Sequence, residues 1–497
     1  MTQISEFFDK LNHFQRVFLL FFIALVVRLL FSFFSHGFHM GDEVGDYLDA
    51  PMWMLYKIGD NIHPGYFLPD YPIRSHMPYY LMACVIKFSE IINITNPIYQ
   101  SIVIRFFLSL WSSLTVICIY YITRLLYPEN KNTAFFTSLL SAVWGFSIYA
   151  DLRTLGESLC TPLIIYGLYL SLVAASKQNK KTSFFSGLML GLGVCFKFQN
   201  ALFFPALAIY GLVKKKFSYC LFLIIGLLVA LIFQGFIDLL SYGSFLTSLF
   251  SYIKLQFFTN FQLETHYAPA YKTIEYLFRL FFVLLFPFVL FFTFKDIKRN
   301  FILTAPAVTY IVFHLIHPLK QLRFFFPILP IFLTTFMSAF SYWAINLSTS
   351  QNKYQLNMRR SIYIILILGI CFQFSSVFFP RQIHGAPKWQ DNANLCFAEN
   401  FVGMQKDSTG FLLYNTKWVE LYFYIRKNIP VLRINKGQKL EDIKDYNKYN
   451  YLIIWAEDKK GRPVSVDIDS KILEDFQYDH QPIKKYGDHW IYKKLTE

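Results

Sequence analysis

Charged residues are scarce in this 497-residue chain, because Lys, Arg, Asp and Glu together make up only 16% of it. A soluble protein carries about a quarter charged residues, so this composition excludes an ordinary soluble globular protein. Hydrophobic residues instead reach 55%, and Phe alone occurs 57 times. We therefore divide the chain by counting its hydrophobic segments rather than by its length.

Several patterns that carry chemistry are missing as well. The seven cysteines contain no Cys-x-x-Cys pair, which excludes a recognisable zinc site or disulfide framework. A Gly-rich phosphate loop and a Ser-His-Asp signal are also absent, so a cytoplasmic nucleotide-sugar or ATP site is unsupported. The net charge is +15, but no compact basic motif with interleaved aromatics accompanies it. We expect no metal, no cofactor and no nucleic-acid partner.

Long apolar runs are what the chain does have. A helix crosses a bilayer with about 20 apolar residues, and by that measure there are about eleven candidate segments. They lie at 14–35, 98–126, 132–150, 157–176, 183–197, 199–213, 217–240, 275–294, 300–316, 323–343 and 361–380. The first is too long for a signal-peptide core and lacks a small-residue cleavage site, so we expect a retained signal anchor. Segment 77–92 is short and is interrupted by Lys87 and Glu90, which indicates a re-entrant or interfacial helix.

Basic residues between these segments predict the topology. If the N-terminus is inside and 77–92 does not span, every inner loop carries a basic cluster, as the positive-inside rule requires. These clusters contain Arg124 and Lys131; Lys177, Lys180 and Lys181; Lys214, Lys215 and Lys216; Lys295, Lys298 and Arg299; and Lys353, Arg359 and Arg360. The sequence thus predicts a polytopic α-helical membrane protein, embedded in lipid, with its N-terminus in the cytoplasm and its C-terminus outside.

Three long pieces then face outward: 36–97, 241–274 and the tail 381–497. The tail is charged, and it contains two short apolar runs, 411–414 and 451–455, that are typical of buried strands, with a helix expected over 418–426. We therefore divide the chain into a transmembrane domain, residues 1–380, and a small extracytoplasmic α/β domain, residues 381–497.

The first outward piece opens with an acidic cluster. After His36 and His39 come four carboxylates within eight residues: Asp42, Glu43, Asp46 and Asp49. At the edge of a membrane, desolvation can raise the pKa of a carboxyl group, and such a group can act as a general base toward an acceptor hydroxyl. A solvated acidic loop is the alternative interpretation.

Other polar residues gather at outward helix ends. Arg153 follows Asp151 at one turn, where it could hold a phosphate or pair with Asp151 or Glu157. Asp238 ends another apolar segment, as a functional acid or as a cap. Lys197, Gln199 and Asn200 lie at a further junction. His317, Lys320 and Arg323 are spaced by three, so a helical turn would place them on one face, where they could bind an anion or anchor lipid headgroups.

Taken in order, these turns resemble the motifs of the lipid-phosphate-mannose-dependent mannosyltransferases of the GT-C fold. Met40-Gly41-Asp42-Glu43 matches the two acids of the family's His-Pro-Asp-Glu motif, and Arg153-Thr154-Leu155-Gly156-Glu157-Ser158 matches its Arg-Thr-Leu-x-x-Ser turn. Asp238–Gly243 and His317–Phe324 resemble its Asp-x-x-Tyr-Gly and His-Lys-Glu-x-Arg-Phe elements in loosened form. Ile73-Arg74-Ser75 and Arg105 have similar counterparts.

This resemblance implies an inverting glycosyltransferase whose donor is a sugar on a polyprenyl phosphate, and we expect that sugar to be mannose. It implies that Asp42 is the base, with Glu43 supporting, and that a glycan or lipid-linked hydroxyl is the acceptor. Donor phosphate and substrate would be bound by Arg74, Arg153, Asp238, His317, Lys320 and Arg323. The site would face the periplasm from the inner membrane of a bacterium, or the ER lumen in a eukaryote.

Three kinds of alternative stay open on the sequence. Another GT-C transferase, adding an aminosugar to lipid A or mannose to protein, would share the acidic loop and the outward tail. A flippase or transporter of a lipid-linked glycan would need charged residues along mid-membrane helix faces and repeat symmetry, which the sequence does not display clearly. A membrane scaffold is the third possibility.

Overall fold

The computed structural model describes most of the chain. The described residues are 10–38, 41–58, 72–259, 267–346, 353–378, 387, 389, 392–414, 416, 421–434, 443, 446–455, 473, 478–479 and 481–494. The chain divides into two compact units. Unit 1 comprises Met1–Ser35, Leu68–Pro78 and Arg105–Trp389, and unit 2 comprises His36–Phe67, Tyr79–Ile104 and Gln390–Glu497. Residues 36–67 and 79–104 thus group with the tail, and whether 381–497 forms a domain alone stays a prediction.

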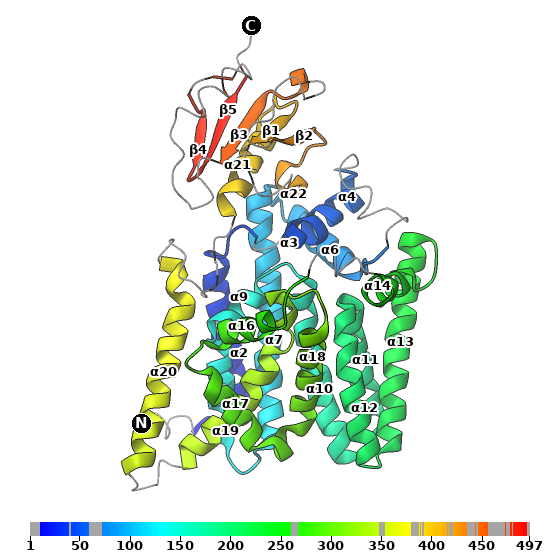
Figure 1. Cartoon of the computed structure of the whole chain (residues 1–497), viewed down its shortest axis with the longest axis vertical. Helices are drawn as coiled ribbons and strands as arrows, with labels where there is room; N and C mark the ends of the chain where they lie inside the picture. Colours follow the sequence, from blue (N-terminus) through cyan, green and yellow to red (C-terminus); the bar gives the residue numbers. More distant parts are fainter. Residues whose placement is uncertain are drawn as a thin grey trace. The chain divides into compact units, whose positions relative to one another are not determined.

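The described part of unit 1 is built from helices (Figure 1). In chain order, the first of these described helices are α2 (His13–Ser32), α7 (Pro97–Leu126, which begins in unit 2), α8 (Lys131–Ala142), α9 (Gly145–Asp151), α10 (Gly156–Lys177) and α11 (Lys180–Phe196). Then come η2 (Phe198–Leu202), α12 (Phe203–Val213), α13 (Phe217–Tyr242) and α14 (Thr247–Phe257). The last are α16 (Tyr271–Phe281), α17 (Phe286–Lys295), α18 (Ile297–Ile316), η3 (Leu322–Phe325), α19 (Leu329–Asn346) and α20 (Lys353–Phe378).

Five of the described helices are long and apolar enough to cross a membrane: α2, α7, α10, α13 and α18. Two more crossings result if bent pairs count as one span each, namely α8 with α9, bent by 62°, and α16 with α17, bent by 91°. The apolar stretches Phe198–Val213 and Arg360–Ser375 are shorter. The sequence estimate of about eleven spans is therefore not confirmed, because hydropathy does not register bends or short helices.

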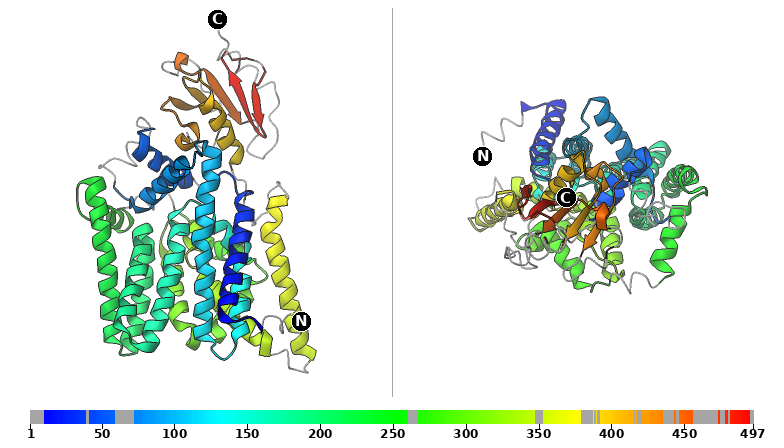
Figure 2. Two further views of the ribbon diagram at one scale, coloured as in Figure 1. Left: turned by 180° about the vertical axis from the view of Figure 1, so that it is seen from behind. Right: turned by 90° about the horizontal axis from the view of Figure 1, so that it is seen from above.

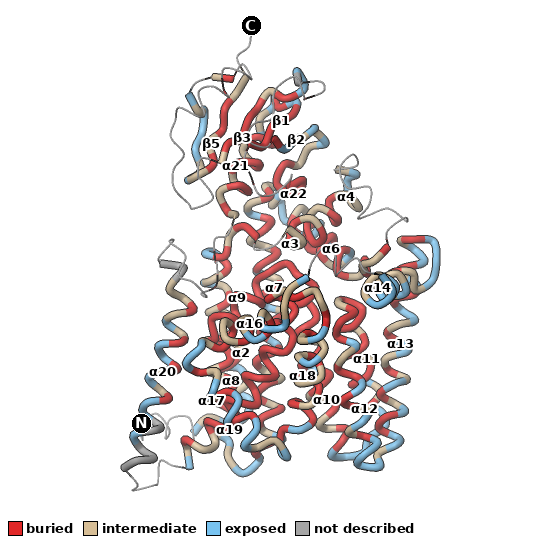
Figure 3. Tube along the Cα trace, viewed as in Figure 1, coloured by how far each residue is buried: buried red, intermediate tan, exposed pale blue. Residues whose placement is uncertain are grey.

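Apolar side chains on the outside of the helices identify the lipid-facing surface. On α2, Phe14, Phe18 and Phe22 recur every four residues and are all exposed, with stacked rings. Along α13, Leu228 and Phe236 are also about half exposed, and Figure 3 shows exposed segments alternating with buried ones along this helix. Such stripes cost free energy in water but none in hydrocarbon, so the protein is an integral membrane protein.

Glycines let three helices approach closely. α11 packs between α10 and α13, and these helices stand side by side in Figures 1 and 2. A Cβ atom at Gly187 would lie 1.9 Å from the Leu223 carbonyl oxygen, and one at Gly226 would lie 2.1 Å from the Phe184 carbonyl oxygen. Backbone-to-backbone contact of this kind is how membrane helices gain packing energy where lipid gives no hydrophobic drive.

A buried ion pair joins α2 to α9. Arg28 donates from Nε and Nη2 to Oδ2 of Asp151, at 2.9 and 2.6 Å, and both side chains are almost fully buried. Arg28 also donates to the carbonyl oxygens of Ala24 and Ala142. Because each charge is matched and further bonded, the pair holds the broken helix α8–α9 against α2.

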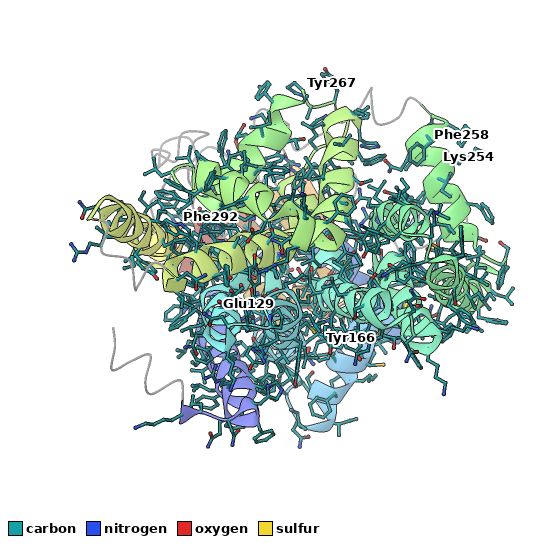
Figure 4. The ribbon with its side chains drawn as sticks, turned by 90° about the horizontal axis from the view of Figure 1, so that it is seen from below. Glu129, Tyr166, Lys254, Phe258, Tyr267 and Phe292 are labelled. Carbon is teal, nitrogen blue, oxygen red and sulfur yellow. The ribbon has the colours of Figure 1, made fainter. Side chains whose placement is uncertain are left out.

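Aromatic rings attach α17 to α19. Phe292, labelled in Figure 4, contacts the rings of Phe336, Phe340 and Trp343 at centroid distances of 6.1, 5.6 and 5.4 Å. Glu129, also labelled in Figure 4, forms an ion pair of 2.9 Å with Arg299. Two other aromatic side chains labelled in Figure 4, Phe258 and Tyr267, are 78% and 68% exposed.

The described residues of unit 2 form short helices and one sheet. Its helices are α3 (Gly41–Val44), the π-helix η1 (Gly45–Asp49), α4 (Ala50–Tyr56), α6 (Met77–Ile91), α21 (Ala393–Met404), α22 (Tyr422–Ile425) and η6 (Tyr446–Lys448). Its strands are β1 (Phe411–Tyr414), β2 (Val431–Ile434), β3 (Tyr451–Trp455), β4 (Lys484–Tyr486) and β5 (His489–Lys493), in the order β2-β1-β3-β5-β4.

The sheet contains both strands that the sequence predicts. β1 and β3 coincide with 411–414 and 451–455, pair in parallel and are buried, while β5 pairs antiparallel to β3. The helix expected over 418–426 appears as α22, although Trp418 lies outside the described residues. The segment 77–92 forms α6, whose 15 residues are too few to span a bilayer.

Candidate functional site

A completely buried acid lies in the first turn of helix α10. Glu157 is its second residue and is completely buried. Its Oε1 lies 2.9 Å from Nζ of Lys197 and 3.7 Å from Nε of Arg323. Its Oε2 accepts no hydrogen bond from any residue in the described part of the chain. One carboxylate oxygen therefore faces two basic side chains that come from distant parts of the sequence.

Lys197 is placed by the sharp junction between α11 and η2. Its backbone is extended, with φ of −153° and ψ of 105°, so that the chain leaves α11 at this residue. Asn200 fixes the turn by donating to the Gly193 carbonyl oxygen at 3.0 Å and to Sγ of Cys160 at 3.1 Å. The Lys197 side chain is 16% exposed, so its ammonium is largely but not wholly removed from solvent.

Arg323 comes from the short helix η3. It is buried, and its Nε donates to Oε1 of Gln321 at 2.7 Å. The ring of Phe324 lies beneath both cations, with its centroid 5.5 Å from Cζ of Arg323 and 5.6 Å from Nζ of Lys197. The charges of Arg323 and Arg74 both act on Lys197, so three basic side chains converge electrostatically on one place in unit 1.

Lys320 and His317 occupy the loop between α18 and η3. Nζ of Lys320 donates to the carbonyl oxygens of Ala268, at 2.8 Å, and of His317, at 2.6 Å. Burial lowers the pKa of Lys320 and also that of His317, which the positive charge of Lys320 lowers further. His317 and Gln321 have extended backbones, so the helical turn that the spacing of three suggested for His317, Lys320 and Arg323 does not form.

Unsatisfied polar groups line the adjacent interior. The hydroxyl of Tyr310 and both ring nitrogens of His314 are buried and have no hydrogen-bond partner among the described residues. The two rings lie 4.7 Å apart, and the His314 ring stacks on Phe324 at 5.3 Å. Buried polar groups normally have partners, so orphaned ones beside a basic cluster indicate a place for a polar ligand.

Arg153 lies in the turn between α9 and α10. It is 1% exposed, its guanidinium lies 4.3 Å from the centre of the Tyr149 ring, and Nη2 donates to the Trp389 carbonyl oxygen at 3.5 Å. The carboxylates expected as its partners are engaged elsewhere, because Asp151 bonds to Arg28 and Glu157 faces Lys197 and Arg323.

Asp238 serves the start of α14. Its carboxylate accepts hydrogen bonds from Nε2 of Gln234, at 2.7 Å, and from the amide and hydroxyl of Ser248. Tyr242, one turn later, donates to the Arg74 carbonyl oxygen at 2.8 Å. Of the two interpretations given for Asp238 from the sequence, a helix cap accounts for these hydrogen bonds. The contact of Tyr242 attaches the loop of Arg74 to α13.

The acidic cluster belongs to unit 2. Asp42 and Glu43 lie in α3, where Glu43 is 2% exposed and Asp42 is half-buried. Asp46 is buried in η1, and Oδ1 of Asp49 accepts a hydrogen bond of 2.6 Å from the Phe423 amide. His39 lies outside the described residues. In the described part of the chain, no group of three His, Cys, Asp or Glu side chains could hold a metal ion.

The structure thus brings together some of the residues that the sequence selected. Arg323, Lys320 and His317 lie in one segment, and Arg74 acts electrostatically on the same centre. Sequence reasoning noticed Lys197 without giving it a role, and it named Glu157 only as a possible partner of Arg153. The available signal was a lysine between two apolar segments at an end predicted to face outward, where the positive-inside rule expects few basic residues.

Comparison with solved structures shows a similar fold at low identity. ArnT from Cupriavidus metallidurans bound to undecaprenyl phosphate is 12% identical, with a TM-score of 0.59 over 97% of this chain and 98% of that chain. The apo form of the same protein is 11% identical, with a TM-score of 0.58 over 96% and 97%. A comparison with curated protein sequences gives no match. At this identity the likeness establishes the fold alone, which is that of the GT-C glycosyltransferases.

The family is established by a different comparison. The model of the Alg9-like mannosyltransferase family matches residues 19–386. That range covers nearly all of unit 1, including Glu157, Lys197 and Arg323, as well as the acidic segment of unit 2. The resemblance stated from the sequence motifs is confirmed, and this glycosyltransferase belongs to the Alg9-like mannosyltransferase family.

Proposed function

We propose that this protein transfers mannose from a polyprenyl-phosphate donor to a hydroxyl of a glycan or lipid-linked acceptor on the outer face of the membrane. The observation that carries the proposal is the buried basic cluster of unit 1, built by Arg323, Lys197 and the charge of Arg74 around one carboxylate. Buried positive charge at the end of membrane helices suits a lipid phosphate. The undecaprenyl phosphate named for ArnT supports the same class of ligand.

In the proposed reaction, the acceptor oxygen attacks the anomeric carbon of the donor sugar from the face opposite to the phosphate. The bond from that carbon to the phosphate oxygen breaks, and its electron pair stays on the phosphate. The acceptor proton passes to the Asp42 carboxylate, with Glu43 in support. The products are a glycoside of inverted configuration and a polyprenyl phosphate monoester.

The leaving phosphate gains negative charge as the bond breaks, so fixed positive groups stabilise the transition state more than the ground state. We assign this role to Arg153, His317, Lys320 and Arg323, and substrate contacts to Arg74 and Asp238. Of these, Arg323 has the geometry best suited to the role, because its guanidinium is buried against Glu157 and Phe324. No step of this scheme requires a metal ion.

The first test of the proposal is sugar transfer by the purified protein in detergent, with polyprenyl-phosphate mannose and a lipid-glycan extract of the host. Asp42→Asn should lower the turnover number about 10²–10⁴-fold, because the amide cannot take up the acceptor proton. Thermal unfolding of the variant should match that of the wild-type protein.

Asp49→Asn is the matched control for this test. Its side-chain oxygen can still accept the Phe423 amide, so turnover should be retained. Full turnover by Asp42→Asn would refute the assignment of the base. If the wild-type protein uses only an aminosugar donor, the chain is another transferase of the same fold. If it moves a lipid-linked glycan across vesicles without forming a new linkage, it is a transporter.

A further inference from the structure

The ion pair between Lys197 and Glu157 leaves hydrogen-bonding capacity of both residues unused. An ammonium group has three N–H donors, and Lys197 has one carboxylate oxygen and one aromatic ring as partners among the described residues. Its side chain retains 16% exposure, so a ligand can reach it. Glu157 is fully buried, and its Oε2 has no hydrogen-bond partner in the described part of the chain. Neither residue is therefore saturated by the other.

A purely structural pair would be built differently. Arg28 and Asp151, in the same unit, show the saturated form: two N–H groups on one carboxylate oxygen, and two more bonds to carbonyl oxygens. The pair of Lys197 has one contact of 2.9 Å and lies over Phe324, next to the buried orphaned groups of Tyr310 and His314. Because unmade hydrogen bonds in a buried place cost free energy, this pair indicates a site completed by a ligand.

We propose that Lys197 binds the phosphate group of the lipid-linked donor and that Glu157 is the resident counter-ion that holds the Lys197 ammonium in place until the phosphate arrives. This inference rests on the proposed function. Lys197 makes the contact with the ligand, and Glu157 is a positioning residue that acts through Lys197 and Arg323. When the phosphate binds, its oxygens take the free donors of Lys197.

Glu157 also has a consequence for turnover. The product phosphate monoester carries more negative charge than the donor diester, so a site with uncompensated cations would retain the product. The Glu157 carboxylate offsets part of that attraction. Glu157→Gln should therefore bind polyprenyl phosphate about tenfold more tightly and show a lower turnover number, because product release becomes slower.

The decisive experiment measures binding of polyprenyl phosphate to the purified full-length protein in detergent. Lys197→Met alone leaves Glu157 buried without its lysine and can fail to fold, so the informative variant is Lys197→Met with Glu157→Gln. Removing both charges should return the melting temperature to near the wild-type value, while affinity for polyprenyl phosphate falls about 10–100-fold with the loss of a charged hydrogen-bond donor.

Two further variants separate charge from shape and position. Lys197→Arg keeps the charge and should stay within about threefold of wild-type affinity. Lys295→Met removes a lysine that contacts the rings of Phe291, Phe292 and Trp343, and it should leave binding unchanged. If Lys197→Arg lost as much affinity for polyprenyl phosphate as the double variant, the positive charge at position 197 would not be what binds the phosphate, and the proposal would be overturned.

The outcomes distinguish this inference from the proposed function. Wild-type affinity in the double variant would show that Lys197 only neutralises Glu157, and it would overturn the inference alone. No binding or transfer by the wild-type protein would overturn the proposed function and the inference together. Displacement of the lipid by inorganic phosphate at comparable concentration would show a general anion site and overturn the assignment to a lipid phosphate.

Discussion

Individual charged residues in this protein fall into two groups that differ in how completely they are bonded. Arg28, Asp151 and Asp238 have hydrogen bonds that account for their charges, and they connect helices. Lys197 and Glu157 keep unused bonding capacity. Because Glu157 is as buried as Asp238, burial alone does not distinguish a structural charge from a functional one, whereas the number of hydrogen bonds made does.

Removing one member of a saturated pair should be costly. Arg28→Met should lower the free energy of unfolding by about 3–5 kcal/mol, because Asp151 is left as an unpaired buried carboxylate. The double variant Arg28→Met with Asp151→Leu should recover most of that loss. Thermal unfolding in detergent measures both. A single variant as stable as the wild-type protein would show that the pair does not hold α2 against α9.

For individual residues, the sequence predicts which positions are candidates for the site better than it predicts which residues they contact. The acidic segment with Asp42 and the basic turn with Arg323 stand out because they interrupt apolar stretches at ends predicted to face outward. The partners of Arg153 were not predictable, since Asp151 and Glu157 are its neighbours in sequence but contact Arg28, Lys197 and Arg323 instead. Contacts between residues at least 40 positions apart, as these three are, leave no trace in local spacing.

At the scale of whole elements, helices were easier to foresee than their geometry. Long apolar runs predict most of the helices of unit 1, and two short apolar runs predict β1 and β3. The bends at α8–α9 and α16–α17 were not predicted, because hydropathy is averaged over a window of residues and does not report a change in the direction of the helix axis. The sheet order β2-β1-β3-β5-β4 also depends on pairing that the strand sequences do not specify.

Close contact between α11 and α13 should make them intolerant of larger residues. Gly187→Ala would place a Cβ atom 1.9 Å from the Leu223 carbonyl oxygen, so the helices must separate. We expect a loss of about 1–3 kcal/mol in the free energy of unfolding. Gly45→Ala is the control, because a Cβ atom there meets nothing within 4 Å. Equal melting temperatures for the two variants would contradict this packing.

For the molecule as a whole, acid should weaken the fold through a buried histidine. His76 precedes α6, its ring lies 4.5 Å from that of Tyr242, and burial lowers its pKa from the usual 6.5 to about 4. A lowered pKa means that the unfolded chain takes up the proton first on acidification. The stability from neutral His76 is therefore present above about pH 6.5 and is lost as the pH falls toward 4.

The expected loss at pH 5 is on the order of 1–2 kcal/mol relative to pH 7.5. Melting temperatures measured across this range should fall for the wild-type protein and fall less steeply for His76→Gln. His13→Gln, which removes an exposed histidine of α2, should keep the wild-type slope. A wild-type slope in His76→Gln would mean that other groups cause the acid sensitivity.

The ion pair between α2 and α9 also constrains how the chain is made. Arg28 and Asp151 are 123 residues apart, so at a synthesis rate of roughly 5–20 residues per second the arginine precedes its partner by about 6–25 s. Throughout that interval α2 carries a cation in the bilayer without its carboxylate partner, and within the helix only the Ala24 carbonyl oxygen accepts a hydrogen bond from it. The arrival of α9 ends this state, so assembly can be delayed or intercepted while α2 is without its partner.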